Sequence, residues 1–577
     1  MSKTNFLLLA CPLFFFLSNC TQKPKADLIL MHGKVYTMQW DDPDLDGKIS
    51  SNAPYVDGNW HPEAEAIAIK DNLILAIGSD NEMQKYAGND TQIIDVHGGT
   101  ILPGLVDSHT HVINLGQNLD LVDLTVASNE AEAVALIVEQ AKNIPAGEWI
   151  VGKGWDEGAW ASHYPDKKLL TERVPNHPVL MRSLHSFASW CNQKALDVAG
   201  FTKDIKSPIG GVIMKDDHGQ LTGLFLNKAT DMIEKAIPAP DHGKLKSWFL
   251  AGLNEMAKSG YVSIHEAGVG AELMQAIDEL DKENKLPIRV YVMLSSDDKP
   301  LMDEWKIRGP YVSNSGMLVV KAVKAFYDGA LGSRGAKLIE NYSDMPGHQG
   351  ISGTDFRFDP ATLNEMAKAG FQLCVHAIGD AANRETLNYF EKMIQGNPLI
   401  KEQRHRIEHA QVVSDIDMSR FASLGVIASM QPSHAVEDMM WAETRLGSER
   451  IKNAYAWRSL RLQHTSLIFN SDLTGTDHNI FYGLHSAITR QNKINEPKEG
   501  WLASQRMTSE EALRGFTVWP AFAAFTEKES GVLAVGKWAD ITVLNIDPLQ
   551  VGEKESSHLL EGKVLLTIVN GKVLFKD

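Results

Sequence analysis

We predict an α/β fold: a TIM (β/α)8 barrel with a small β-sandwich domain and one insertion. Three features of the 577-residue sequence support this prediction. Short apolar runs alternate with helical patterns through the middle of the chain, strand-like segments occur at both ends, and polar residues follow several of the runs. Alternating strands and helices are typical of a parallel sheet covered by helices. A doubly wound α/β sheet is the alternative, because periodicity cannot distinguish an open sheet from a closed one.

The start of the chain resembles the leader of a bacterial lipoprotein. Lys3 precedes an apolar run over 6–17, which is too short to span a bilayer. The run leads into Ser18, Asn19 and Cys20, similar to a lipobox, although Asn19 stands where Gly or Ala is usual. This resemblance implies that residues 1–19 are a signal peptide and that Cys20 becomes lipidated.

The leader predicts where the mature protein resides. We expect an exported protein, lipid-anchored to a bacterial membrane and facing the periplasm. The outer membrane is favoured, because Thr21 and Gln22 lack the Asp associated with inner-membrane retention. A secretory leader without a lipid is the alternative.

Strand-like segments at the two ends predict one small β domain. Short apolar segments lie at 27–36, 66–77, 92–96, 539–544 and 565–575. The last contains Asn570-Gly571 between two apolar runs, which is a hairpin signal. We therefore predict a composite β-sandwich domain formed by residues 20–99 and 526–577.

Residues 100–525 contain the predicted barrel. Its eight strands are predicted at 100–105, 261–264, 288–294, 318–326, 372–375, 405–407, 426–430 and 467–469. The gap between the first two is too long for one helix. We interpret residues 145–225 as an insertion and expect it to fold over the mouth of the barrel.

Polar residues follow the predicted strands, and in a TIM barrel the active site lies at these carboxyl ends. His109 and His111 end the first strand, and a His-x-His pair on a strand points both imidazoles to one face. His376, His409 and Asp472 end the fifth, sixth and eighth strands. Imidazoles with a carboxylate suit zinc and other divalent ions, so the pattern predicts a metal site.

Four motifs resemble the metal-dependent amidohydrolase superfamily. ILPGLVDSHTH at 101–111 is similar to the start of its barrel, and GVLAVGKWAD at 531–540 is similar to its return to the β domain. VKAFYDG at 323–329 and NSD at 470–472 resemble the branch of YtcJ-like and N-substituted formamide deformylase-like proteins, amidohydrolase family 3. The resemblance extends from about residue 26 to residue 576.

The resemblance implies one or two divalent ions, with zinc expected. The implied ligands are His109, His111, Lys324, His376, His409 and Asp472. His109 and His111 would bind the first ion and His376 and His409 the second, with a carbamylated Lys324 as the bridge. The alternative for Lys324 is a salt bridge to the carboxylate four residues later.

Asp472 is the implied general acid and base. It would take a proton from water that the metal activates as hydroxide, and pass it to the leaving nitrogen. The expected reaction is cleavage of a non-peptide carbon–nitrogen bond in a small-molecule amide. A helix N-cap is the alternative role for Asp472.

Three further side chains are candidates for substrate binding. Trp155 and Arg182 lie in the predicted insertion, and His434 follows the seventh strand. A core tryptophan and a solvated loop histidine are the alternatives for Trp155 and His434.

Net charge restricts the partners. The formal net charge of −17 disfavours nucleic acid and anionic lipid. We expect a small-molecule substrate and membrane contact only through the lipid anchor; the sequence does not predict an oligomeric state. Two other functions stay open: a non-catalytic small-molecule-binding lipoprotein, and deamination or ester hydrolysis at the same site.

Overall fold

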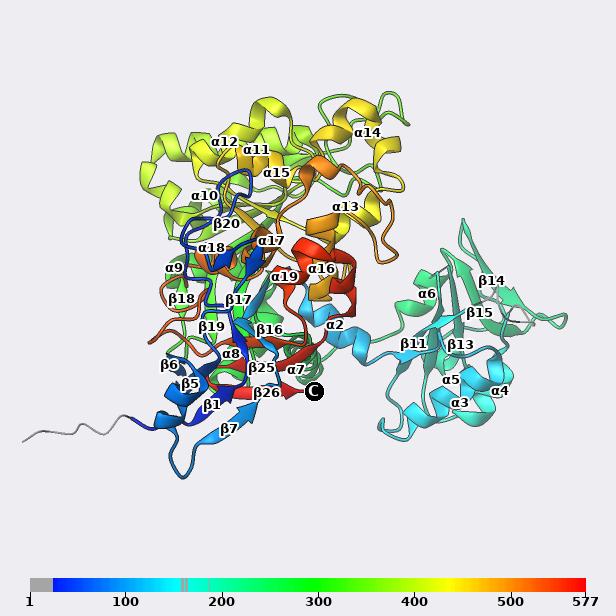
Figure 1. Cartoon of the computed structure of the whole chain (residues 1–577). Helices are drawn as coiled ribbons and strands as arrows, with labels where there is room; N and C mark the ends of the chain where they lie inside the picture. Colours follow the sequence, from blue (N-terminus) through cyan, green and yellow to red (C-terminus); the bar gives the residue numbers. More distant parts are fainter. Residues whose placement is uncertain (1–23, 157–159, 161–163, 186) are drawn as a thin grey trace, which may run out of the picture.

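The computed structural model describes residues 24–156, 160, 164–185 and 187–577 (Figure 1). The predicted leader and Cys20 lie outside these ranges, so the lipid anchor stays a prediction. Within the described ranges, no helix combines the length and apolar character needed to cross a membrane.

Eight parallel strands form a nearly closed barrel, which confirms the barrel part of the predicted fold. In sheet order they are β9 (Leu105–Thr110), β16 (Tyr261–Val269), β17 (Arg289–Ser295), β19 (Leu318–Phe326), β20 (Gln372–Ala377), β21 (Arg406–His409), β22 (Ile427–Met430) and β23 (Leu467–Phe469). An isolated bridge between Thr110 and Leu473 joins the two ends of this sheet. The strands are almost entirely buried, as expected when helices cover a parallel sheet.

The helices follow the strands in the expected alternation. The longer ones are α7 (His242–Lys258), α8 (Ala271–Lys282), α9 (Lys299–Arg308), α10 (Pro360–Lys368), α11 (Asp380–Gly396), α12 (Asp415–Leu424) and α16 (Ile480–Thr489). Three begin at an aspartate whose carboxylate accepts a backbone N–H of the first turn: Asp241, Asp298 and Asp359. Each such cap stabilises its helix by about 1 kcal/mol.

The first predicted strand is divided between two sheets. Residues 100–103 form β8 (Thr100–Pro103), which pairs with β2 (Lys34–Val35) and β24 (Ile541–Leu544). The barrel strand therefore begins at Leu105 rather than at residue 100. A Cβ on Gly104 would lie 2.3 Å from the side chain of Val262, so only glycine allows the chain to pass this point. β8 is fully buried and β9 almost fully, so the apolar run alone could not reveal the break.

Segments from both termini form two small sheets. One has the order β6-β5-β1-β7, from β1 (Leu28–Met31), β5 (Ala66–Lys70), β6 (Leu73–Gly78) and β7 (Gln92–Asp95). The other has the order β2-β8-β24-β25-β26 and includes β25 (Val564–Val569) and β26 (Lys572–Lys576). Side chains of both sheets share one buried cluster, including Leu30, Ile67, Ile541 and Ile568. That the sheets stack as a sandwich domain stays a prediction.

The insertion contains its own mixed sheet. Its order is β10-β11-β12-β13-β15-β14, from β10 (Val122–Asp123), β11 (Ile150–Trp155), β12 (Val179–Ser183), β13 (Ala188–Cys191), β14 (Gly211–Lys215) and β15 (Leu221–Asn227). One buried cluster joins this sheet to α3 (Glu130–Ala141) and α4 (Lys167–Arg173). A second joins it to α5 (Gln193–Val198) and α6 (Thr230–Glu234). Strand β10 already lies before residue 145, so the sheet starts earlier than predicted.

The insertion stands beside the barrel and not over its mouth (Figure 1). It is connected to the barrel through α2 (Val112–Leu119) and α7. No described residue of the insertion lines the cavity at the carboxyl ends of the strands. The expectation of a cover is therefore wrong. Two buried clusters lie within the insertion itself, so its sheet has a core of its own without the barrel.

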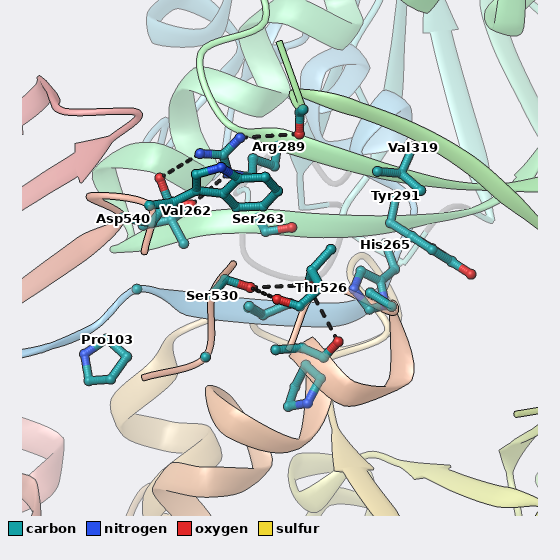
Figure 2. Close-up of a pocket in the computed structure, with 18 of the residues that line it drawn as sticks. Pro103, Val262, Ser263, His265, Arg289, Tyr291, Val319, Thr526, Ser530 and Asp540 are labelled. Atoms are coloured by element: carbon teal, nitrogen blue, oxygen red, sulfur yellow. Dashed lines mark hydrogen bonds and ion pairs between the residues drawn. The ribbon is translucent and has the colours of Figure 1, made fainter. Parts of the chain in front are cut away.

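An ion pair between the barrel and the C-terminal segment lies at the end of the barrel where the strands begin (Figure 2). Arg289 donates to Asp540 at 2.6 Å, and its guanidinium lies 3.6 Å from the ring centre of Trp538. These contacts join β17 to the C-terminal β segment. The adjoining cavity is about 40 Å³, room for no more than a few water molecules. It is too small for an organic substrate.

Candidate metal centre

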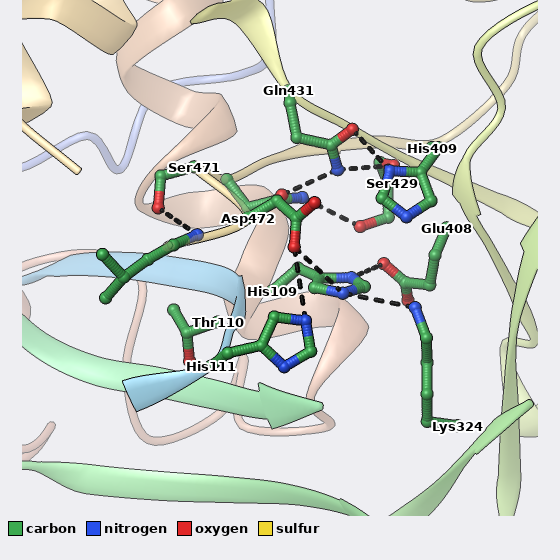
Figure 3. Close-up of polar contacts among 12 residues, drawn as sticks. His109, Thr110, His111, Lys324, Glu408, His409, Ser429, Gln431, Ser471 and Asp472 are labelled. Atoms are coloured by element: carbon green, nitrogen blue, oxygen red, sulfur yellow. Dashed lines mark hydrogen bonds and ion pairs between the residues drawn. The ribbon is translucent and has the colours of Figure 1, made fainter. Parts of the chain in front are cut away.

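The six predicted metal ligands line one cavity of about 410 Å³ at the carboxyl ends of the barrel strands. Figure 3 shows five of them converging: His109, His111, Lys324, His409 and Asp472. They come from β9, β19 and β21 and from the chain that directly follows β9 and β23. The parallel direction of these strands places all of their ends at one edge of the barrel.

Asp472 lies between imidazoles from the two strands that flank β23, namely β9 on one side and β22 on the other. Its Oδ1 is 3.4 Å from Nε2 of His111 and 3.7 Å from Nε2 of His109. Its Oδ2 is 3.8 Å from Nε2 of His434. Burial opposes ionisation, but the hydrogen bond with His111 holds the pKa of Asp472 well below its usual value. The carboxylate is therefore ionised at neutral pH. It does not cap the helix that follows, because α16 begins after Asn479, which is the N-cap.

Two triads have ligand atoms close enough to hold an ion. One is His109, His111 and Asp472, and the other is His409, His434 and Asp472. Burial lowers the pKa of His109, and it lowers the pKa of His409 to about 3. These imidazoles are therefore uncharged, the form that binds metal.

Lys324 is fully inside the barrel. Its Nζ lies 3.2 Å from Nε2 of His109, and burial lowers the pKa of the amine. The alternative role, a salt bridge to Asp328, does not occur among the described residues: Asp328 accepts the backbone N–H groups of Lys337, Ile378 and Gly379 instead. Lys324 therefore faces the imidazole of His109, and no carboxylate of the described residues forms an ion pair with it.

His376 lies behind His409. The two ring centres are 4.5 Å apart, and Nε2 of His376 is 3.6 Å from Oδ1 of Asp328. This Nε2 is buried and has no hydrogen-bond partner among the described residues. His376 lines the cavity but is in neither triad.

Glu408 is a site residue that sequence reasoning did not select. Its Oε2 accepts a hydrogen bond from Nδ1 of His109 at 2.6 Å, and both side chains are buried. This contact leaves Nε2 of His109 free for a metal, as carboxylates behind ligating histidines do. Glu408 precedes His409, and its position at a strand end was the available signal.

Two further buried carboxylates hold the backbone around the ligands. Asp107 accepts the hydroxyl of Ser471 at 2.5 Å and its N–H at 3.1 Å, which links β9 to the loop of Asp472. Glu266 accepts the N–H groups of Val112 and Ile113 at the start of α2, directly after His111. The ligand positions therefore depend on contacts between distant segments.

Of the three candidates for substrate binding, the structure brings only His434 to the cavity. Trp155 is buried in the insertion and donates from Nε1 to the carbonyl of Met181. Arg182 pairs with Glu234 in the same insertion. Neither reaches the cavity, because the insertion stands beside the barrel. Apolar and polar side chains missed by sequence reasoning line it instead: Phe326, Leu331, Gln411, Glu437 and Trp441.

The residues present fit a divalent metal. Uncharged imidazoles and an ionised carboxylate are the donors that zinc and related ions prefer. Ligand atoms about 2.0–2.2 Å from one tetrahedral ion lie roughly 3.3–3.6 Å apart. The separations of 3.4 Å between Asp472 and His111 and of 3.7 Å between Asp472 and His109 are close to this range.

A parallel β/α barrel with imidazole and carboxylate donors at its strand ends defines a class, that of the metal-dependent barrel hydrolases. Comparison with known proteins identifies the family. The sequence profile of the amidohydrolase family matches residues 92–575, and the chain belongs to that family.

Relatives span nearly the whole chain. It is 30% identical over 523 residues to "Putative amidohydrolase YtcJ" of Bacillus subtilis, covering 89% of this chain and 96% of that protein. It is 25% identical over 554 residues to "N-substituted formamide deformylase" of Arthrobacter pascens, covering 92% and 98%. A solved structure, an uncharacterized metal-dependent hydrolase from Pyrococcus furiosus, matches with a TM-score of 0.69 and 26% identity, covering 90% of this chain and 99% of that chain.

Proposed function

We propose that this protein is a metal-dependent hydrolase that cleaves a non-peptide carbon–nitrogen bond in a small-molecule amide. The observation that carries the proposal is the Asp472 carboxylate beside the imidazoles of His109 and His111 in a cavity of about 410 Å³. The name of the Arthrobacter pascens relative, a deformylase of N-substituted formamides, supports an amide as the substrate class.

His109, His111 and Asp472 would hold the metal, with zinc as the expected ion. When bound, such an ion lowers the pKa of water and polarises a carbonyl oxygen. Lys324 belongs to the same proposal. Burial lowers the pKa of its amine, which favours the reaction of the deprotonated amine with carbon dioxide to form a carbamate and release a proton; the carbamate would add oxygen donors beside His109.

Asp472 acts as the general base and acid. A water oxygen adds to the carbonyl carbon while the Asp472 carboxylate accepts the proton. Asp472 then passes this proton to the amide nitrogen, the carbon–nitrogen bond breaks, and a carboxylic acid and an amine leave. Phe326, Leu331 and Trp441 form an apolar part of the wall, which suits an apolar substituent on the nitrogen.

The test is amine release from a panel of N-substituted formamides and other small amides by the zinc-loaded protein. We expect turnover by the wild type and a loss of at least about 10²-fold in kcat for Asp472→Asn. Asp477→Asn is the matched control, because Asp477 lies nearby but pairs with Lys493 outside the cavity.

Three outcomes would contradict the proposal. Full activity of Asp472→Asn would show that Asp472 is not the general base. Turnover of esters or aminated rings without any amide identifies a different reaction at this site. Tight binding of an amide with no turnover would show that the protein binds small molecules without catalysing their hydrolysis.

A further inference from the structure

We propose that Asp438 and Gln411 form a binding site for an ammonium group of the substrate, in the wall of the cavity and apart from the metal ligands. Asp438 ends α13 (Pro432–Asp438), and Gln411 follows β21. Both side chains line the cavity of about 410 Å³, and neither belongs to a metal triad. The inference rests on the proposed amide hydrolysis and deepens it, because it names the substrate class: small amides that carry a positively charged amine.

Tyr455 fixes the orientation of both side chains. Its hydroxyl donates to Oδ2 of Asp438 at 2.6 Å, and Nε2 of Gln411 donates to the same hydroxyl oxygen at 2.6 Å. A tyrosine has one hydroxyl proton, so the oxygen that donates to Asp438 has to accept from Gln411. The amide of Gln411 therefore points its nitrogen at Tyr455 and leaves its oxygen Oε1 for another contact.

Two oxygen atoms of this cluster have no hydrogen-bond donor. Among the residues that the structure describes, none donates to Oδ1 of Asp438 or to Oε1 of Gln411. Gln411 is only 5% exposed, and a polar atom so deeply buried is costly to leave without a partner. A carboxylate oxygen and an amide oxygen both accept hydrogen bonds, so together they select a group with several N–H donors.

The backbone holds Tyr455 in place. Its N–H donates to the carbonyl oxygen of Gln411 at 2.6 Å, and its own carbonyl oxygen accepts from Nη1 of Arg490 at 3.1 Å. Its ring packs edge-on against Trp501, with centres 5.4 Å apart. Tyr455 is buried and does not line the cavity. It is therefore a positioning residue that acts on the ligand through Asp438 and Gln411.

The charges of the cavity wall favour a cation over an anion. Besides Asp472, two acidic side chains line it, Glu437 and Asp438. Among its described lining residues, Lys324 is the only lysine or arginine, and it lies beside His109. A substrate carboxylate would therefore meet no basic side chain outside the metal centre, whereas an ammonium group would meet Asp438.

Burial raises the pKa of Asp438, while the hydrogen bond from Tyr455 opposes that rise. A cation bound beside the carboxylate favours its charged form further. Ammonium and carboxylate therefore stabilise each other in this wall.

An aromatic ring belongs to the same turn of the chain. The N–H of Trp441 donates to the carbonyl oxygen of Asp438 at 3.0 Å, and the Trp441 side chain lines the cavity. The face of a tryptophan ring attracts cations and also packs against methylene groups. A short alkyl substituent that ends in an ammonium group suits this combination of apolar wall and carboxylate.

The first experiment gives the zinc-loaded protein three N-alkylformamides of matched length, which end in a methyl, an ammonium or a carboxylate group. For the wild type, kcat/KM should be at least about tenfold higher for the ammonium-ended amide than for the methyl-ended one, and lowest for the carboxylate. Asp438→Asn keeps an acceptor for Tyr455 but removes the charge, so it should lower this preference at least about tenfold. Glu443→Gln, at an exposed position of α14 (Ala442–Arg450), is the matched control and should retain the preference.

The second experiment measures binding without hydrolysis. Calorimetry of the metal-free protein with butylammonium and with butyrate should show binding of butylammonium only, and weaker binding by at least about tenfold in Asp438→Asn. Thermal melting checks that the variants fold. The comparison of the three amides and of the two ions with the wild type needs no variant, so the test stays decisive if Asp438→Asn is unstable.

Equal kcat/KM for the methyl-ended and ammonium-ended amides overturns the inference, as does a preference for the carboxylate or an ammonium preference that Asp438→Asn retains. Failure of the proposed function gives a different result. Butylammonium binding that depends on Asp438, with no hydrolysis of any amide, would contradict only the hydrolase. Hydrolysis of the methyl-ended amide without an ammonium preference would contradict only the ammonium site.

Discussion

Glu408 and His109 form the most buried polar contact of the metal centre, with exposed fractions of 0% and 1% for their side chains. Burial opposes the charge on Glu408, but the adjacent His109, Lys324 and Arg406 hold the pKa of its carboxyl well below the usual value. A charged carboxylate behind the imidazole keeps its proton on Nδ1 and raises the basicity of Nε2. The strength of metal binding therefore depends on a residue that need not touch the ion.

Glu408→Gln should weaken zinc binding by about 10–100-fold, because the amide cannot replace the charge that polarises His109. Competition with a chromogenic chelator measures the change. Glu443→Gln, at an exposed position of α14 (Ala442–Arg450), is the control and should leave the affinity unchanged. Equal affinities in the two variants would show that Glu408 has only a packing role.

His405 predicts a dependence of stability on pH. It is buried, stacks on Phe390 with ring centres 5.0 Å apart, and accepts the N–H of Leu373 at its Nδ1. Burial lowers its pKa to about 3. The unfolded chain takes up a proton below about pH 6.5 whereas the folded chain does not, so stability falls as the pH falls from there toward 3.

Between pH 7 and pH 5 the wild type should lose up to about 2 kcal/mol more stability than His405→Gln, whose side chain does not titrate. Urea denaturation at the two pH values measures this difference. The same loss in both proteins would assign the pH dependence to other groups.

At the scale of elements, the site is held by contacts between strand ends and the loops that follow them. Asp107 on β9 binds Ser471 after β23, and the bridge between Thr110 and Leu473 joins the same two segments. Glu266 on β16 caps α2 just after His111. These links keep the two ends of the barrel sheet together where Asp472 and the His-x-His pair meet.

Glu266→Ala should destabilise the protein by about 2–3 kcal/mol, because it leaves the N–H groups of Val112 and Ile113 buried without an acceptor. Chemical denaturation of the metal-free protein measures the free energy of unfolding. The matched control is Glu272→Ala on the exposed face of α8, which should change stability by less than about 0.5 kcal/mol. A similarly small change at Glu266 would contradict its capping role.

For the whole molecule, the position of the insertion decides which residues can contact a substrate. Its sheet has its own buried clusters on both faces, and the lobe stands beside the barrel (Figure 1). The pair of Arg182 with Glu234 is partly exposed, with 29% of the arginine side chain accessible. Such pairs contribute only about 0–1 kcal/mol.

Arg182→Ala should therefore change kcat and KM for an amide by less than about twofold. Trp441→Ala, in the wall of the cavity, should raise KM by at least about fivefold, because it removes a large apolar contact. Steady-state kinetics with one amide compares the two variants. A large effect of Arg182→Ala would mean that the insertion reaches the cavity in solution.

The proposed lipid anchor also belongs to this scale. Cys20→Ala should move the exported protein from the membrane fraction to the soluble fraction, since the thiol is the proposed point of lipid attachment. Fractionation of the producing cells measures the change. A variant that stays in the membrane fraction would show that Cys20 is not the site of lipid attachment.

Much of the barrel and its metal site follows from local sequence patterns. All eight predicted runs overlap a barrel strand of the structure, although the first overlaps only at Leu105. The six predicted ligands line one cavity, because residues at the ends of parallel strands must meet at one edge of a barrel. Strand periodicity and strand ends are local properties, so one chain suffices to predict them.

Tertiary structure alone decided which side chains touch and where the insertion stands. Glu408 and His109 are 299 residues apart, and Asp107 and Ser471 are 364 apart, so no local pattern relates them. His434 joins His409 and Asp472 because three strand ends converge, whereas His376 turns toward Asp328. The sequence determined the kinds of donor available for a metal. Their grouping into two triads was decided by closure of the barrel, because contact distances depend on how all eight strands pack together.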